Sequence, residues 1–283
     1  VVSRRLAELG FAGAVCVDFR EALLMAGAGV PLGNVGHLVQ TPHAALGRIL
    51  AAHPDIMTVY SVEKAAEIGA EAERQGFVQP IMLRVLGPAD TLYSGQYGGF
   101  ELAELGRVVD ELERIGGARV AGVCSFPCLF FSDETGELEP LPNAQTVREA
   151  AALLEARGYE GLQLNMPSAS CVHSVPVVAG LGGTHMEPGH GLSGTTPYHA
   201  AHPGEPEGVA YAYVSEVSHN LGERSYCYGG GHYRRGHLQG ALVGRNVESA
   251  VRVGVTPPTD ESIDYHFELS QLLQVSEPVL MCF

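Results

Sequence analysis

The stretch of the sequence that carries the most chemical information is Met-Glu-Pro-Gly-His-Gly at residues 186–191. Gly189 and Gly191 allow the backbone to approach a ligand closely, and the amide groups of such a turn can bind a phosphate. Glu187 is placed to face the same ligand, and His190 can move a proton near pH 7. The alternative is a plain glycine-rich turn with a surface glutamate, and the residues alone keep both interpretations open.

Further candidate acid–base groups come from the histidines, of which the sequence has 12. His37 follows a strand-like run, and His219 and His232 lie at a strand end or in a glycine-rich segment. A neutral imidazole in such a place can transfer protons, although it can also simply order a loop through a hydrogen bond. Tyr228 and Tyr233 flank a run of glycines, and for them packing is the alternative to catalysis.

A metal site is the main competing interpretation of these residues. Histidines together with Glu187, Asp18, Glu216 or Asp90 could form a mixed nitrogen and oxygen site. The sequence has no HxH, HExxH or CxxC pattern, and metal-binding spacing is the signal that such motifs normally give. We therefore predict no metal site and keep a metal-dependent barrel hydrolase or aldolase as an alternative function.

The elements that must position these residues alternate along the first two thirds of the chain. The expected strands are Gly13–Val17, Val35–Gln40, Ile56–Ser61, Ile81–Leu86, Val120–Phe126, Gly161–Asn165 and Gly183–Glu187. The expected helices are Val2–Leu9, Glu21–Gly27, Pro42–Ala52, Glu63–Gln75, Glu101–Ile115 and Ala144–Arg157. Strands that alternate with helices predict a parallel sheet, and in a β/α barrel the active site lies at the carboxyl ends of the strands.

The number of strands suggests an α/β fold of the (β/α)8 barrel type from which strand one is missing. No GxGxxG or GxxxxGK[ST] motif follows the first strand, which disfavours dinucleotide-binding and P-loop folds. We expect strand one to lie upstream of residue 1, and both ends to be interior points of a longer chain. Residues 193–208 are rich in Gly, Pro, His and Thr and predict a linker. We therefore expect a barrel at residues 1–192, with the linker and a β-rich domain at 193–283.

Composition excludes several classes of partner. The formal charge is −15, with 32 acidic against 17 basic residues, so there is no dense basic face for a nucleic acid. No apolar run is long enough to span a membrane, and no signal peptide opens the chain. The six cysteines form no CxxC pair. We expect them to be reduced and mostly buried in a cytoplasmic protein.

The motif at residues 187–191 resembles the EPGR motif of the fold-type-III decarboxylases that use pyridoxal 5'-phosphate (PLP). In position it is similar to the RPG motif of alanine racemase. The resemblance implies that Glu187 faces the pyridine nitrogen and keeps it protonated, while Gly189, His190 and Gly191 bind the phosphate. A carboxylate makes the cofactor a stronger electron sink than the arginine of the racemase does, which disfavours simple racemisation.

Other segments follow the same fold in order. Residues 124–126 resemble the strand on which a histidine packs against the cofactor ring, with Ser125 at that position. Residues 164–168 resemble the Asn-Ser phosphate site of strand seven, which implies cofactor contacts for Asn165 and Ser168. Residues 228–235 resemble a segment of the racemase β domain. Together with residues 36–40, which contain His37, and residues 215–219, the pattern is most similar to the YhfX-type relatives of alanine racemase.

This resemblance implies a PLP-dependent enzyme that acts on an amino acid or related amine, as a racemase, an epimerase or a lyase. His219, Tyr228 and His232 are the candidate catalytic residues, and Tyr233 is a candidate cofactor ligand. Lys64, the only lysine, begins a helix as a solvated residue, so we expect the Schiff-base lysine upstream of residue 1. A protein that holds PLP without turnover is a further alternative. The resemblance also implies a homodimer.

Overall fold

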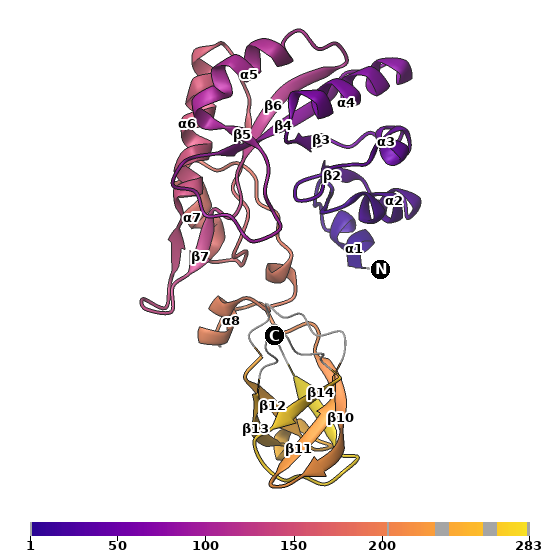
Figure 1. Cartoon of the computed structure of the whole chain (residues 1–283), viewed down its shortest axis with the longest axis vertical. Coiled ribbons are helices and arrows are strands. Elements are labelled where there is room, and N and C mark those ends of the chain that lie inside the picture. Colours follow the sequence, from indigo (N-terminus) through magenta and orange to yellow (C-terminus); the bar gives the residue numbers. More distant parts are fainter. Residues whose placement is uncertain (1, 203, 230–237, 257–264, 282–283) are drawn as a thin grey trace. The chain divides into compact units, whose positions relative to one another are not determined.

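The computed structural model describes the chain except for residues 1, 203, 230–237, 257–264 and 282–283. It divides the chain into two compact units, Val1–Pro188 and Gly189–Phe283 (Figure 1).

The first unit is built on a parallel sheet in the strand order β1-β2-β3-β4-β6-β9. These strands are β1 (Ala14–Cys16), β2 (Leu32–Val35), β3 (Ile56–Val59), β4 (Gln79–Leu86), β6 (Ala118–Cys124) and β9 (Gln163–Asn165). A parallel bridge between Asn165 and His185 extends the sheet by one position. The short β5 (Phe100–Glu101) pairs with β4, and β7 (Leu129–Phe131) and β8 (Leu138–Pro140) form a separate antiparallel pair.

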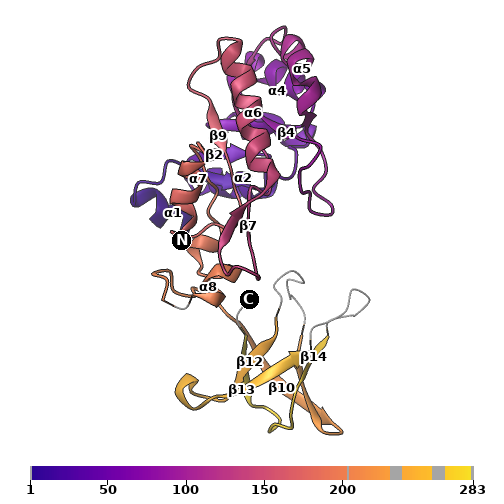
Figure 2. The same ribbon diagram turned by 90° about the vertical axis from the view of Figure 1, so that its left-hand side faces the viewer.

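Helices connect the strands and cover one face of this sheet (Figures 1 and 2). They are α1 (Val2–Glu8), α2 (Phe19–Gly27), α3 (His43–Leu50), α4 (Val62–Gln75), η1 (Leu102–Glu104), α5 (Leu105–Leu112), α6 (Pro142–Ala156) and α7 (Ser174–Gly180). Asp18 caps α2 by accepting from the backbone N–H groups of Arg20 and Glu21. Ser61 caps α4 in the same way. These caps start both helices one or two residues before the predicted position.

The two faces of the sheet differ in chemistry. Side chains alternate between the faces along a strand, and Ile81, Leu83 and Val85 of β4 belong to the core that packs against the helices. Met82, on the opposite face, contacts Ile56 and Cys124 in a small separate cluster. Beyond that apolar layer, the opposite face carries polar side chains toward the carboxyl ends of the strands, and these side chains form the site described below.

The second unit contains a closed antiparallel barrel in the order β10-β11-β14-β13-β12-β15 (Figure 2). The elements of the second unit are η2 (His190–Leu192), α8 (Pro197–Ala201), β10 (Tyr213–Leu221), β11 (Arg224–Tyr228), β12 (Gly240–Val243), η4 (Val247–Ser249), β13 (Val251–Thr256), β14 (His266–Leu269) and β15 (Pro278–Met281). Its interior is an apolar core that includes Val217, Cys227 and Phe267. The prediction of a β-rich second domain is confirmed.

The predicted alternation of strands and helices is confirmed as an α/β fold, but the sheet of the first unit is not closed among the described residues. The strand predicted at 35–40 is wrong, because β2 ends at Val35 and Gly36 turns the chain with a φ of 89°. Gln40 then holds this turn by donating to the carbonyl groups of Gly36 and Thr58. As a result, His37 lies beyond the end of β2.

Two further differences concern local signals. The expected strand at 183–187 is reduced to the single bridge at His185. The expected linker at 193–208 contains α8, which starts with Thr196 and His199 in a reciprocal capping arrangement, so the segment is partly helical. None of the helices in the described parts of the chain is long and apolar enough to cross a membrane.

Candidate functional site

The carboxylate of Glu187 lies at the carboxyl ends of the strands and is only 9% exposed. Its Oε1 atom accepts a hydrogen bond from Nδ2 of Asn34 at 2.9 Å and another from Nδ2 of Asn165 at 2.6 Å. Asn34 comes from β2 and Asn165 from β9, so strands from distant parts of the sequence hold one carboxylate. The glutamate is a positioned buried group and not a surface residue.

A hydrogen bond from Thr58 fixes the orientation of the Asn34 side chain. The hydroxyl of Thr58 donates to Oδ1 of Asn34 at 2.8 Å, which requires the NH2 group of Asn34 to point at Glu187. Two donors therefore occupy Oε1 of Glu187, and Oε2 is the less occupied oxygen. The arrangement fixes which oxygen of the carboxylate is available to a ligand.

His37 lies beside that second oxygen. Its Nε2 atom is 3.2 Å from Oε2 of Glu187, and its ring meets the ring of Phe126 edge-on at 5.4 Å. The geometry at neither ring nitrogen gives a hydrogen bond to any described residue. Burial lowers the pKa of His37, and the positive charge of Arg84 adds to this effect while Glu187 opposes it. The imidazole is therefore neutral near pH 7.

A pH dependence of stability follows from this depressed pKa. The unfolded imidazole takes up a proton near pH 6.5, whereas the folded one does so only at lower pH. The unfolded state binds more protons in this window, so stability falls as the pH falls from 6.5. The His37→Gln variant should lose this component, which amounts to at most about 1.4 kcal/mol per pH unit. Urea unfolding of both proteins between pH 7.5 and 5.5 measures the difference.

The control for this measurement is His53→Gln, because His53 is exposed and its ring contacts Phe77 and not a carboxylate. This variant should keep the slope of the natural protein. Equal slopes for the natural protein and His37→Gln would contradict the prediction.

Arg84 and Tyr60 extend the polar network. Nη1 of Arg84 donates to the hydroxyl of Tyr60 at 2.7 Å, and that hydroxyl donates to the carbonyl of His37 at 2.6 Å. Four polar atoms of this network are buried without a hydrogen-bond partner in the described part of the chain: Nε of Arg84, Oδ1 of Asn165 and both ring nitrogens of His37. Buried polar atoms are nearly always paired, so such a group of unpaired atoms indicates a ligand site.

The structure also places the two predicted serines. Ser125 is fully buried, and its hydroxyl accepts from Nδ2 of Asn143 at 3.0 Å and donates to Asp90 at 3.4 Å. Ser168 donates to the carbonyl of Leu129 at 2.6 Å. Both hydroxyls are engaged within the protein, and their cofactor contacts stay predictions.

The remaining predicted residues belong to the second unit. Gly189 precedes η2, Gly191 lies within it, and Nδ1 of His190 is 2.9 Å from the hydroxyl of Thr195. On the barrel, His219 stacks on Tyr226 with ring centroids 5.0 Å apart. Tyr228 is 52% exposed and lies in register with His266 of the neighbouring strand β14. His232 and Tyr233 lie outside the described residues.

Lys64 lies in the first turn of α4. Its ammonium group pairs with Glu67 and donates to the carbonyl of Thr41 at 3.1 Å. It makes none of the contacts of the Glu187 network, and its partners are those of a structural helix lysine.

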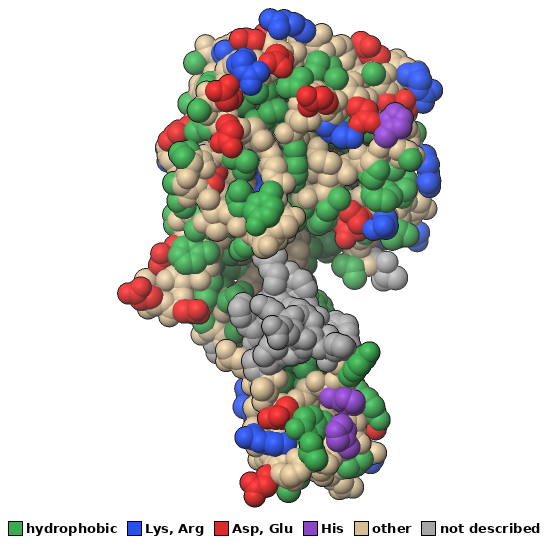
Figure 3. Space-filling model, viewed as in Figure 1, with side chains coloured by type: hydrophobic (Ala, Val, Ile, Leu, Met, Phe, Trp, Pro, Cys, Tyr) green, Lys and Arg blue, Asp and Glu red, His purple; other side chains and the backbone are tan. Residues whose placement is uncertain are grey.

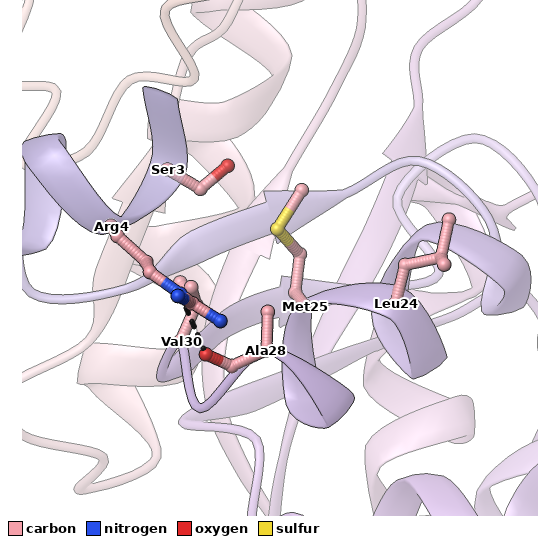
Figure 4. A pocket seen from close by; sticks show the side chains of 6 residues that line it. All are labelled: Ser3, Arg4, Leu24, Met25, Ala28 and Val30. Atoms are coloured by element: carbon pink, nitrogen blue, oxygen red, sulfur yellow. Dashed lines mark hydrogen bonds between the residues drawn. The ribbon is translucent and has the colours of Figure 1, made fainter. Parts of the chain in front are cut away.

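Elsewhere on the first unit, a cavity of about 340 Å³ lies between α1 and α2 (Figure 4). Arg4 crosses it to donate to the carbonyl of Ala28. The face drawn in Figure 3 shows acidic and basic side chains interspersed, without a continuous basic patch. No cluster of three or more His, Cys, Asp or Glu side chains within the described ranges is arranged to hold a metal ion.

Sequence reasoning missed Asn34, Tyr60 and Arg84. Asn34 and Tyr60 are polar residues at or beside a strand end, and Arg84 interrupts the apolar run of β4. A charged residue within a strand that is otherwise buried was the available signal, because such a residue is rarely buried without a ligand or partner.

Comparison with known proteins gives consistent matches over the chain. Residues 1–197 match the family model described as "Alanine racemase, N-terminal domain", and residues 212–283 match "YhfX-like, C-terminal domain". The chain is 40% identical to the "Uncharacterized protein YhfX" of Escherichia coli (strain K12), over its whole length and 73% of that protein.

Solved structures agree with this match in fold. D-threo-3-hydroxyaspartate dehydratase from Delftia sp. HT23 is 16% identical, with a TM-score of 0.68 over 99% of this chain and 79% of that one. D-threonine aldolase from Filomicrobium marinum is also 16% identical, with a TM-score of 0.67 over 99% and 75%.

Proposed function

Since the chain belongs to the YhfX-type branch of the alanine-racemase-like, fold-type-III superfamily, we propose that it is a PLP-dependent enzyme. Its substrate is an amino acid or a related amine, and the reaction breaks a bond at the α carbon. The observation that carries the proposal is the buried Glu187 carboxylate, which two amides hold beside polar atoms that have no hydrogen-bond partner among the described residues.

The residues present fit this cofactor. When bound, PLP stabilises the negative charge that bond breaking leaves on the α carbon, and a protonated ring nitrogen strengthens this effect. Glu187 would hold the proton on the ring nitrogen, since its Oε2 atom has acceptor capacity left. Asn34 and Asn165 would orient that carboxylate, and His37 would line the same site.

We propose Ser125, Ser168, Gly189, His190, Gly191 and Tyr233 as further cofactor ligands. His219, Tyr228 and His232 are proposed for proton transfer at the α carbon. Two proton-transfer groups on opposite faces of the substrate would give a racemase or epimerase, and one would give a lyase. The carboxylate at position 187 favours lyase chemistry, because it supports a more strongly electron-withdrawing cofactor than an arginine does.

The test uses the purified full-length protein loaded with PLP. We expect a visible absorption band and exchange of the α proton of an added amino acid in deuterated water, followed by NMR. Borohydride reduction and peptide mapping should not place the cofactor on Lys64, which forms an ion pair with Glu67, and we propose the lysine expected upstream of residue 1 as its attachment site. Exchange with inversion of configuration supports a racemase, and loss of a substituent supports a lyase.

Other outcomes separate the alternatives. Stoichiometric PLP without exchange for any of the twenty amino acids or their amines would support a cofactor-holding protein instead. A bound transition metal without PLP would support a metal-dependent hydrolase or aldolase. We further propose a homodimer, to be measured by sedimentation. We also propose a cytoplasmic location, which fits the five cysteines in the described part of the chain, all of them buried and outside any disulfide.

A further inference from the structure

Arg84 is a cation that the fold buries completely. It lies in β4 between Leu83 and Val85, and its side chain has no exposed surface. A guanidinium stays charged at all relevant pH values, and its burial costs several kcal/mol unless an anion compensates the charge. In the described parts of the chain, no carboxylate forms an ion pair with it.

The two hydrogen bonds of Arg84 go to neutral acceptors. Nη1 donates to the hydroxyl of Tyr60 at 2.7 Å, and Nη2 donates to the carbonyl of Gln96 at 2.8 Å. The Nε–H group is buried and has no acceptor among the described residues. The ring of Tyr60, whose centroid lies 5.0 Å from the guanidinium carbon, stabilises part of the positive charge, but the buried Nε–H donor has no acceptor among the described residues, which indicates that an acceptor is missing from the site.

The surroundings of Arg84 belong to the Glu187 network. Tyr60 links the guanidinium to the backbone of His37, and His37 lies 3.2 Å from Glu187. The charges of both Arg84 and Glu187 act on the imidazole of His37. The same buried region therefore contains one positive and one negative group, with unpaired polar atoms among them.

We propose that Arg84 binds an anionic oxygen of the ligand in this site through its unpaired Nε–H group. This inference rests on the proposed function and deepens it. Two groups carry such an oxygen: the ring hydroxyl of PLP, which ionises, and the carboxylate of an amino-acid substrate. Both accept charge-assisted hydrogen bonds from a guanidinium.

The first arm of the test concerns the cofactor. The full-length protein is titrated by calorimetry with PLP and with 3-O-methylpyridoxal 5'-phosphate, whose oxygen cannot become negative. A hydrogen bond to a charged group corresponds to a preference of roughly 10- to 100-fold for PLP. Arg84→Met should reduce that preference to about 1, and Arg84→Lys should restore part of it because the charge returns.

The second arm concerns the substrate. The PLP-loaded protein is titrated with glycine and with methylamine, which differ only in the carboxylate, and its absorption spectrum is followed. If the anionic oxygen belongs to the substrate, the natural protein prefers glycine and Arg84→Met loses that preference. The matched control in both arms is Arg119→Met, an exposed arginine of β6, which should keep the natural preferences.

The outcomes separate this proposal from the proposed function. If PLP binds and Arg84→Met keeps both preferences, Arg84 is structural and the inference is wrong, while the proposed function stands. If PLP does not bind at all, both are wrong. Circular dichroism shows whether Arg84→Met folds. Should it not fold, equal affinity of the natural protein for PLP and its methyl ether, together with equal affinity for glycine and methylamine, would contradict the proposal.

Discussion

The Glu187→Gln variant is expected to exchange the α proton of a substrate about 10²- to 10³-fold more slowly than the natural protein, the loss typical when one group that stabilises developing charge is removed. Glutamine has the same shape, and its amide oxygen can still accept from Asn34 and Asn165. The fold should therefore be kept. A neutral amide cannot hold the positive charge on the ring nitrogen, so the cofactor becomes a weaker electron sink.

Two measurements check this result. The exchange rate is followed by NMR in deuterated water, and the protonation state of the ring nitrogen is read from the chemical shift of 15N-labelled cofactor. We expect a protonated nitrogen in the natural protein and an unprotonated one in Glu187→Gln. Glu160→Gln, at an exposed position, is the control and should match the natural protein in both measurements. An unchanged exchange rate with an unchanged nitrogen shift in Glu187→Gln would remove the role of this carboxylate.

Periodicity predicted most of the strand and helix order of the first unit because its strands are apolar and its helices amphipathic, but it did not predict α7 or the short strands β5, β7 and β8. The ends of the elements depended on single residues. Asp18 and Ser61 start α2 and α4 earlier than the apolar pattern does, because their side chains accept backbone hydrogen bonds. Gly36 ends β2 earlier, because its positive φ turns the chain. Such effects of single residues hardly change the hydrophobic periodicity, so the periodicity does not predict where these elements begin and end.

Site residues that belong to a sequence motif could be predicted. Site residues whose role depends only on the register of a strand could not. Glu187 and His37 follow glycine-rich or strand-end patterns, and the structure brings them together. Asn165 was expected through resemblance at a phosphate, whereas its amide donates to Glu187. Asn34 and Arg84 were missed because their role depends on which face of the sheet they occupy, and that face is defined only after the strands pair.

Long-range partners could not be predicted from the sequence. Ser125 was assigned to the cofactor ring because residues 124–126 resemble the strand on which a histidine packs against that ring. In the structure its hydroxyl contacts Asp90 and Asn143, which lie 35 and 18 residues away in the sequence. A hydroxyl forms whichever hydrogen bond its neighbours offer, so its role is decided by packing and not by its own residue type. The same holds for the four contacting residues Asn34, Asn165, His37 and Glu187, here called the tetrad. Their contacts also depend on how distant segments pack together.

The Asn165→Asp variant tests how tightly the protein holds that tetrad. It places a second carboxylate where Nδ2 of Asn165 now donates to Glu187 at 2.6 Å. Two carboxylates this close cannot both ionise, so the pKa of the pair rises and the pair shares one proton. At pH 8 we expect the free energy of unfolding to fall by about 3–5 kcal/mol, as for an uncompensated buried charge. Urea unfolding measures this loss.

The dependence on pH distinguishes charge repulsion from poor packing in the same variant. Above the ordinary carboxyl pKa of about 4, the unfolded pair is ionised while the folded pair keeps a proton. The folded state therefore binds more protons, and stability relative to the natural protein should recover by about 1.4 kcal/mol per pH unit as the pH is lowered through the raised pKa. Asn165→Leu, which has a similar volume and no charge, should be destabilised by an amount that does not change with pH. If Asn165→Asp showed the same flat profile, its carboxylate would lie away from Glu187, and the two amides would not be what holds that residue in place.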